Sequence, residues 1–232
     1  LLEDKLGGLI AGYFSIQGLN AIQKQAEKFT LLESRVRRLS DTAEDATKTY
    51  GELLSISNRT GVDLGETVSL WQSLTSSLDA SNDQILLFTE TLQKLGSIGG
   101  SSAEEMSNAL RQLNQSMAGG VVRAEEYNSV NEQMPEVLRA ISKELFGSSK
   151  EMGRLRKMML DGKLTSDIVF ESILKQAEDV NEEYKKMPRR VSQASQALVN
   201  NFGAAVANLD QKLGAFENIV RFIDFLSGEI ES

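Results

Sequence analysis

Residues 101–147 read SSAEEMSNALRQLNQSMAGGVVRAEEYNSVNEQMPEVLRAISKELFG, and this stretch decides the fold class. Ser101 and Glu104 have the spacing of a capping box, the side-chain pair that begins many α-helices. Gly119 stands where the first helix should end, because glycine enters left-handed backbone without a side-chain clash. The second helix keeps one apolar face, formed by Tyr127, Val130, Met134, Leu138, Ile141 and Leu145.

Pro135 interrupts this second helix. A proline donates no backbone hydrogen bond, and the residue before a proline disfavours the helical conformation. The proline therefore either kinks one helix or starts a second one, and we favour a break at Met134.

The same order of polar cap, apolar helical spacing and closing glycine recurs along the chain. Ser148 and Glu151 form a second capping-box spacing, and Gly96 is expected to close another helix. Helices are expected over residues 15–39, 43–59, 66–78, 82–96, 102–118, 124–145, 149–160 and 165–186. The alternating pattern of strands is missing. The predicted fold class is therefore all-α, a compact multi-helix domain with short loops followed by a long C-terminal helix.

The long C-terminal helix is predicted from apolar residues spaced by three or four. They are Val191, Ala194, Leu198, Phe202, Ala205, Leu209, Leu213, Phe216 and Val220. This spacing averages about 3.67 residues per turn, which favours a straight or slightly right-handed packing seam. The helix either lies along the domain or forms the root of a rod that continues beyond residue 232.

Three parts of the chain are distinguished by these patterns. Residues 1–30 are predicted to be a glycine-rich apolar leader and first helix. Residues 31–188 are predicted to be the globular helical domain, and residues 189–232 the long helix and the expected start of a rod. The apolar stretch at residues 6–16 is shorter than the roughly 20 residues that span a membrane.

Composition excludes much of the usual chemistry of active sites. The 232 residues contain neither Cys nor His, so disulfides, thiolate nucleophiles, Cys/His zinc sites and His-based triads are excluded. Twenty-five Lys and Arg face 33 Asp and Glu, a net charge of -8 that disfavours general binding to a phosphate backbone. We expect no cofactor, no metal, no nucleic acid and no catalytic residue.

Charged clusters give only weak indications of a site. Lys150, Arg154 and Lys157 form one basic stripe on a helix, which either docks an acidic partner or is a solvated face. Adjacent carboxylates, such as Glu104 and Glu105, point about 100° apart on a helix and do not converge on one substrate.

Four pieces of the sequence, in order, resemble the tape-measure domain of tailed-phage tail proteins. The longest is residues 99–137, with a Gly-Ser opening, a Gln-containing helix, a small-residue turn and an Arg-x-Glu-Glu-x-Asn-Ser helix that ends in Gln-x-Pro. DGKLTS at residues 161–166 and MPRRVS at residues 187–192 resemble two turns of that family, and FSIQGL at residues 14–19 has a similar character.

This resemblance implies a structural protein of a phage or prophage virion. Such a protein sets the length of the tail tube, templates tail assembly and can aid genome delivery. Its partners would be tail tube subunits, tail assembly chaperones or tail-end proteins, with self-association through the long helix as a further option. The protein would lie in the virion tail, and in the host bacterial cytoplasm during assembly.

The residues that carry the resemblance are mostly glycines, prolines and helix-start residues. They are Gly120, Arg123, Glu126, Asn128, Pro135, Gly162, Lys163 and Pro188. Their expected role is structural, to place turns between helices, and the partner-binding residues are not identified by the sequence. Two other functions stay open: a non-phage bacterial helical adaptor or binding module, and a cell-wall hydrolase domain carried on a tail protein, which would need two converging carboxylates.

Overall fold

The computed structural model describes residues 16–188 and 190–213, and this part of the chain forms eleven α-helices and no strand. The helices are α2 (Ile16–Arg38), α3 (Ala43–Thr60), α4 (Leu64–Ser77), α5 (Asn82–Ile98), α6 (Ala103–Gly119), α7 (Ala124–Gln133), α8 (Pro135–Phe146), α9 (Met152–Leu160), α10 (Ser166–Lys175), α11 (Ala177–Lys185) and α12 (Val191–Leu213). The all-α prediction is confirmed. The long C-terminal helix is described only as far as Leu213, and its continuation lies outside the described residues.

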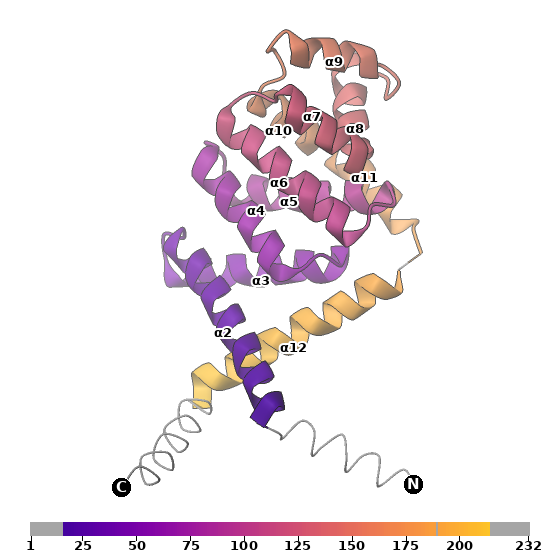
Figure 1. Ribbon diagram of the computed structural model, residues 1–232. Helices are drawn as coiled ribbons and strands as arrows, with labels where there is room; N and C mark the ends of the chain where they lie inside the picture. The colour runs from indigo at the N-terminus through magenta and orange to yellow at the C-terminus, as the bar shows by residue number, and fades with distance from the viewer. Residues whose placement is uncertain (1–15, 189, 214–232) are drawn as a thin grey trace, which may run out of the picture.

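Helix α5 lies at the centre of the molecule (Figure 1) and packs against α3, α4, α8, α10 and α11. Its last two turns, from Thr91 to Ser97, are buried on every side. The Phe88 ring lies 4.9 Å from the Phe170 ring of α10. A helix that is covered all round needs few charges on its surface, and the one cation in this run, Lys94, is paired.

The predicted break before Pro135 is confirmed. Met134 leaves the helical conformation with φ -139° and ψ 61°, and Pro135 is the first residue of α8. Val130, Met134 and Leu138 are all buried, so the apolar face continues across the break.

Both predicted capping boxes are wrong in their residues. The first box forms one residue later, between Ser102 and Glu105, because the Ser101 hydroxyl is buried and donates to the Gln133 carbonyl oxygen at 2.6 Å. The second box does not form, because the Ser148 hydroxyl accepts instead from the Lys150 amide at 3.2 Å and α9 begins only at Met152.

Two predicted helix boundaries are also wrong. Helix α5 continues past Gly96, which serves close packing, since a Cβ there would lie 2.7 Å from the Met106 side chain. The single helix expected over 165–186 is broken at Gln176, whose buried side chain donates to the Glu144 carboxylate on α8 at 3.0 Å. This break separates α10, which packs on both α8 and α5, from α11, which packs on α5.

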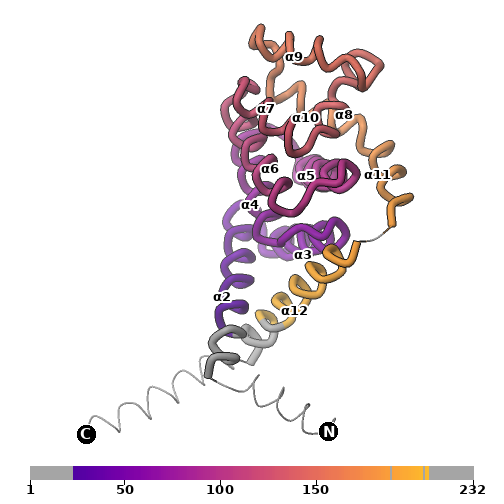
Figure 2. Tube along the Cα trace, turned by 45° about the vertical axis from the view of Figure 1, so that its right-hand side comes forward, coloured from indigo at the N-terminus to yellow at the C-terminus, as the bar shows by residue number. Residues whose placement is uncertain are grey.

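The described chain begins and ends at one end of the molecule. The start of α2 and the end of α12 lie together there, and α9 lies at the opposite end (Figures 1 and 2). Helix α12 crosses α2 and packs on α2 and α3. Helix α2 runs without interruption from Ile16 to Arg38, across the predicted boundary at residue 30, and the division into three parts stays a prediction.

Candidate interaction surfaces

Two of the turns that carry the family resemblance meet in space. The Val122 amide donates to the Leu164 carbonyl oxygen at 2.9 Å, and the Ser166 amide donates to the Gly120 carbonyl oxygen at 3.0 Å. Gly120 ends α6 with φ 77°. The turn after α6 and the turn before α10 are thus joined by backbone hydrogen bonds although more than 40 residues separate them.

The other motif residues lie mainly at helix ends. The Arg123 amide donates to the Glu126 carboxylate at 3.1 Å where α7 begins, and the Lys163 amide donates to the Met158 carbonyl oxygen at 2.9 Å where α9 ends. Gly162 has φ 67° in the same turn. Asn128 and Pro188 are exposed.

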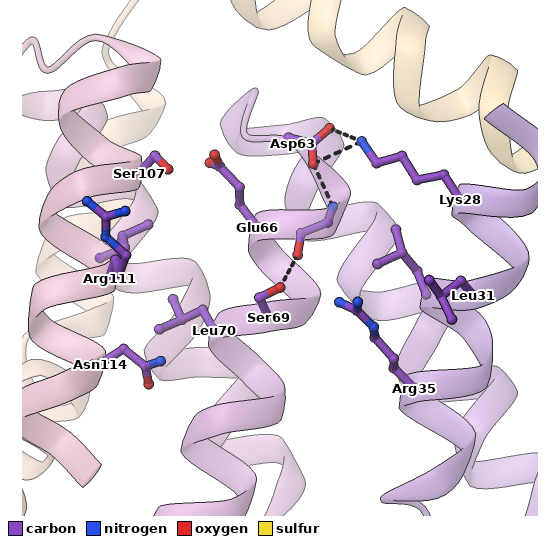
Figure 3. A pocket seen from close by; sticks show the side chains of 13 residues that line it. Lys28, Leu31, Arg35, Asp63, Glu66, Ser69, Leu70, Ser107, Arg111 and Asn114 are labelled. Carbon is purple, nitrogen blue, oxygen red and sulfur yellow. Dashed lines mark hydrogen bonds and ion pairs between the residues drawn. The ribbon is translucent and has the colours of Figure 1, made fainter. Parts of the chain in front are cut away.

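A cleft of about 410 Å³ opens between α2, α4 and α6 (Figure 3). Buried side chains of Leu32, Leu70 and Leu110 form its apolar part. The carboxylates of Asp63 and Glu66, three residues apart at the start of α4, both line it.

These two carboxylates are not equivalent. Asp63 accepts from the Gly65 amide at 2.8 Å as the N-cap of α4, and it is paired with the Lys28 ammonium at 3.0 Å. Burial raises the pKa of Glu66, to which the Asp63 charge adds, while a hydrogen bond from Ser107 and the Lys28 charge oppose it. Asp63 is therefore occupied by structural contacts. Among the described residues, the cleft has no free carboxylate opposite Glu66 that would complete a hydrolytic pair.

Helix α12 packs against the domain through polar and small residues, the reverse of the usual amphipathic helix. Gln193, Asn200, Gly203 and Ala207 are buried, and their spacing of seven, three and four places them on one face. Gly203 lies so close to the Phe29 ring of α2 that a Cβ would come within 2.3 Å of it.

Side-chain amides supply most of the directed contacts of this buried face. The Asn200 amide donates to the Ser57 hydroxyl at 2.8 Å and to the Val62 carbonyl oxygen at 3.2 Å. The Gln193 amide donates to the Thr60 carbonyl oxygen at 3.3 Å and to the Tyr184 hydroxyl at 3.2 Å. The helix is therefore docked through hydrogen bonds to the end of α3 and to α11.

Three large apolar residues of α12, Val191, Leu198 and Phe202, lie on the opposite face. The exposed fractions are 84% for Val191, 71% for Leu198 and 44% for Phe202. These residues belong to the packing seam predicted from the sequence. The seam faces away from the domain, and the helix contacts the domain through its opposite face. The signal for the true contact was present in the spacing of Gln193, Gln196, Asn200 and Gly203, which sequence reasoning passed over because these residues are polar or small.

The basic stripe of α9 lies at the end of the molecule away from α12 (Figure 1). Arg154 and Lys157 belong to α9, but Lys150 lies in the turn before the helix begins at Met152, so the predicted stripe on one helix is wrong at Lys150. All three side chains are exposed, as a solvated face would be. The Arg154 guanidinium lies 4.3 Å from the centre of the Phe146 ring, which holds this side chain over the end of α8.

The described residues include no cluster of three or more Asp or Glu side chains that could hold a metal ion. Among the helices over 16–188 and 190–213, none is both long and apolar enough to cross a membrane.

Comparison with known proteins gives one match. The family model of the tape measure protein matches residues 20–211, from the first turns of α2 to the last turn of α12. No curated protein and no solved structure matches the chain.

Proposed function

The chain belongs to the tape measure protein family, a family of structural phage tail components, and we propose that it sets the length of the tail tube and templates its assembly. The observation that carries this proposal is the match over residues 20–211, which includes every turn singled out for the resemblance. The physical basis is that an α-helix rises about 1.5 Å per residue, so the number of residues in a rod becomes a length.

The arrangement of the helices supports a compact body beside a rod. Helices α2 and α12 approach each other at one end of the molecule, so a rod that follows α12 would leave the body there (Figure 2). The motif residues would then act through the fold, by fixing the turns that hold α6, α7, α9 and α10 together. We propose no catalytic activity for this domain, since Asp63 is held by Lys28 and by the α4 N-terminus.

The proposed partners are tail tube subunits, tail assembly chaperones or tail-end proteins, with self-association through the long helix. The proposed site of assembly is the host cytoplasm, and aid to genome delivery is a later role. A non-phage adaptor and a cell-wall hydrolase remain the rival functions, and no contact in the described structure favours either.

The test is the length of the tails. In the phage that carries the gene, an in-frame block of about 30 residues is removed from a helical part of the product outside residues 20–211. Tails seen by electron microscopy should shorten by about 45 Å, at 1.5 Å per residue. Tails of unchanged length would contradict the proposed role in setting tail length and would favour the adaptor function.

The control for this test alters the body and leaves the number of residues unchanged. A Leu92→Asp substitution places a charge in the centre of the core, where the side chain is fully buried, and should unfold the domain. If the body is needed for assembly, this phage makes fewer tails, and those that form have the normal length.

A further inference from the structure

Over residues 191–208, the outward face of α12 presents exposed apolar side chains and carries no charge. Residues 191–208 contain no Asp, Glu, Lys or Arg, in a chain where 25% of residues are charged. Val191, Leu198 and Phe202 lie on this face, and the flanking positions are Ala194, Ser195 and Ala205. Large exposed side chains on uncharged surroundings are typical of a surface that is covered in an assembly.

The apolar side chains are placed outward although the same helix has a face against the domain that could have buried them. That inner face uses Gln193 and Asn200 instead, each of which needs a hydrogen-bonding partner when buried. Packing within the domain therefore does not explain why the outer positions carry Leu and Phe.

We propose that the outward face of α12, formed by Val191, Leu198 and Phe202, is the contact with the same helix of a second copy of the chain. The self-association named in the proposed function is thereby assigned to one helix face. An identical helix brings no charge into the buried contact, whereas a charged partner would have to desolvate its charges against an uncharged surface.

Charge favours this face over the rest of the surface, and spacing favours an identical helix as its occupant. Each chain carries a net charge of -8, so two copies repel each other over most of their surfaces, and the uncharged face of α12 is where that repulsion is weakest. The apolar residues recur with an 11-residue period, so the stripe stays nearly parallel to the helix axis and meets an identical stripe along its length. The contact is of the self-complementary kind found in two-fold dimers.

The first test is the mass of the 232-residue chain in solution. Sedimentation from about 1 to 200 µM should show a monomer that becomes a dimer in the micromolar range. Leu198→Glu should remain monomeric throughout, because the new charge would be buried in the contact.

The matched control is Leu160→Glu at the last residue of α9, where the leucine is 67% exposed. Helix α9 lies at the end of the molecule away from α12 (Figure 1). This variant should dimerise as the parent chain does. Both substitutions are at exposed positions, so circular dichroism spectra and unfolding temperatures that match the parent chain at about 1 µM, where every chain is expected to be monomeric, show that the fold is kept. A parent chain that stays monomeric up to the highest concentration would overturn the proposal, as would equal loss of the dimer in both variants.

A second test uses the absence of cysteine from the chain, because each introduced thiol is then the only one. Leu198→Cys should form a disulfide-linked dimer readily under mild oxidation. Ser192→Cys, an exposed position about a quarter turn away from the stripe, should do so at least about tenfold more slowly if the stripes face each other. Equal rates at the two positions would contradict the proposed contact.

The inference and the proposed function fail separately. A monomeric chain leaves the tail-length result untouched, because the ruler role depends on the length of the rod. Tails of unchanged length would remove the ruler role without changing the mass of the isolated chain.

Discussion

Gly203 is the residue that determines how closely α12 approaches α2. It is buried, and an added Cβ would lie between 2.3 and 2.7 Å from three carbons of the Phe29 ring. Phe29 is itself 1% exposed and belongs to the core, so its ring has little room to move aside. The docking of α12 therefore depends on a missing side chain as well as on hydrogen bonds.

Gly203→Ala should destabilise the chain by about 1–3 kcal/mol, because the methyl group overpacks the contact with Phe29. The control is Gly51→Ala in the middle of α3, where no atom lies within 4 Å of the added Cβ. That change should stabilise the chain by about 0.5–1 kcal/mol, since alanine favours a helix interior more than glycine does. Urea unfolding measures both, and similar effects of the two substitutions would contradict this account.

Glu90 is the acid through which pH should act on stability. Burial alone would raise its pKa, but hydrogen bonds and charge from Arg59 and Lys94 hold the pKa below the ordinary value of 4.5. The Arg59 guanidinium lies 2.9 Å from one carboxylate oxygen, and the Lys94 ammonium lies 2.8 Å from the other. Lys94 also donates to Asn181 on α11 at 2.7 Å, so the pair links α3, α5 and α11.

A lowered pKa in the folded state stabilises the fold above the unfolded value, and this stability is lost as pH falls through the folded value. Glu90→Gln should therefore cost on the order of 1–3 kcal/mol at pH 7 and less at pH 3. Glu182→Gln, in an exposed pair with Lys185, should change stability little at either pH. Unfolding midpoints across this range measure the effect, and a deficit for Glu90→Gln that is independent of pH would refute it.

At the scale of elements, the sequence predicted the helices well because their signals are local. Helical spacing and glycine stops placed α3 and α6 within about one residue, and Pro135 marked the break between α7 and α8. The break at Gln176 could not be predicted, because its cause is a contact with Glu144, distant in sequence. The inward face of α12 is different, because the spacing of its polar and small residues is visible in the sequence. What the sequence does not show is the set of partners, such as the Ser57 hydroxyl, that lets the Asn200 amide be buried there.

The pairing of the turns at Gly120 and Leu164 offers a test at this scale. Gly120→Ala should destabilise the chain by about 1–2 kcal/mol, because a residue with a Cβ is strained at φ 77°. Gly119→Ala is the matched control, since Gly119 is still helical and both glycines have open space around a Cβ. Thermal unfolding should give a lower midpoint for Gly120→Ala than for Gly119→Ala. Equal midpoints would show that a residue with a Cβ is not strained in this left-handed turn.

At the scale of the whole molecule, the core and α12 are built from different interactions. The core is formed by large apolar side chains from all the helices α2 through α11. Helix α12 contributes only Ala207, among its described residues, to this buried apolar cluster. The other contacts of α12 include the amides of Gln193 and Asn200, the Asn201 side-chain oxygen that accepts from Asn58 at 2.8 Å, and the glycine against Phe29. A helix that buries little apolar area gains less from docking, because burial contributes about 25 cal/mol per Å².

Helix α12 should therefore open at a lower free energy than the core. In the Leu198→Glu chain, where a dimer cannot add protection, the backbone amides of α12 should exchange with deuterium at least about tenfold faster than those of α5. This corresponds to about 1.4 kcal/mol of difference in opening free energy. Exchange of both helices at one common rate would mean that α12 is an integral part of the cooperative fold.

Opening at low free energy has a consequence for assembly. If α12 detaches while α2 to α11 stay folded, the Gln193 and Asn200 amides become hydrated, and the outward stripe with Leu198 remains apolar on both the docked and the detached helix. Pairing between copies therefore does not require the helix to leave the domain, and the pair can form first. Because the stripe exists only while α12 is helical, pairing should oppose the loss of helix that exposes the backbone amides. In the parent chain, raising the concentration should therefore slow exchange in α12 and leave α5 unchanged.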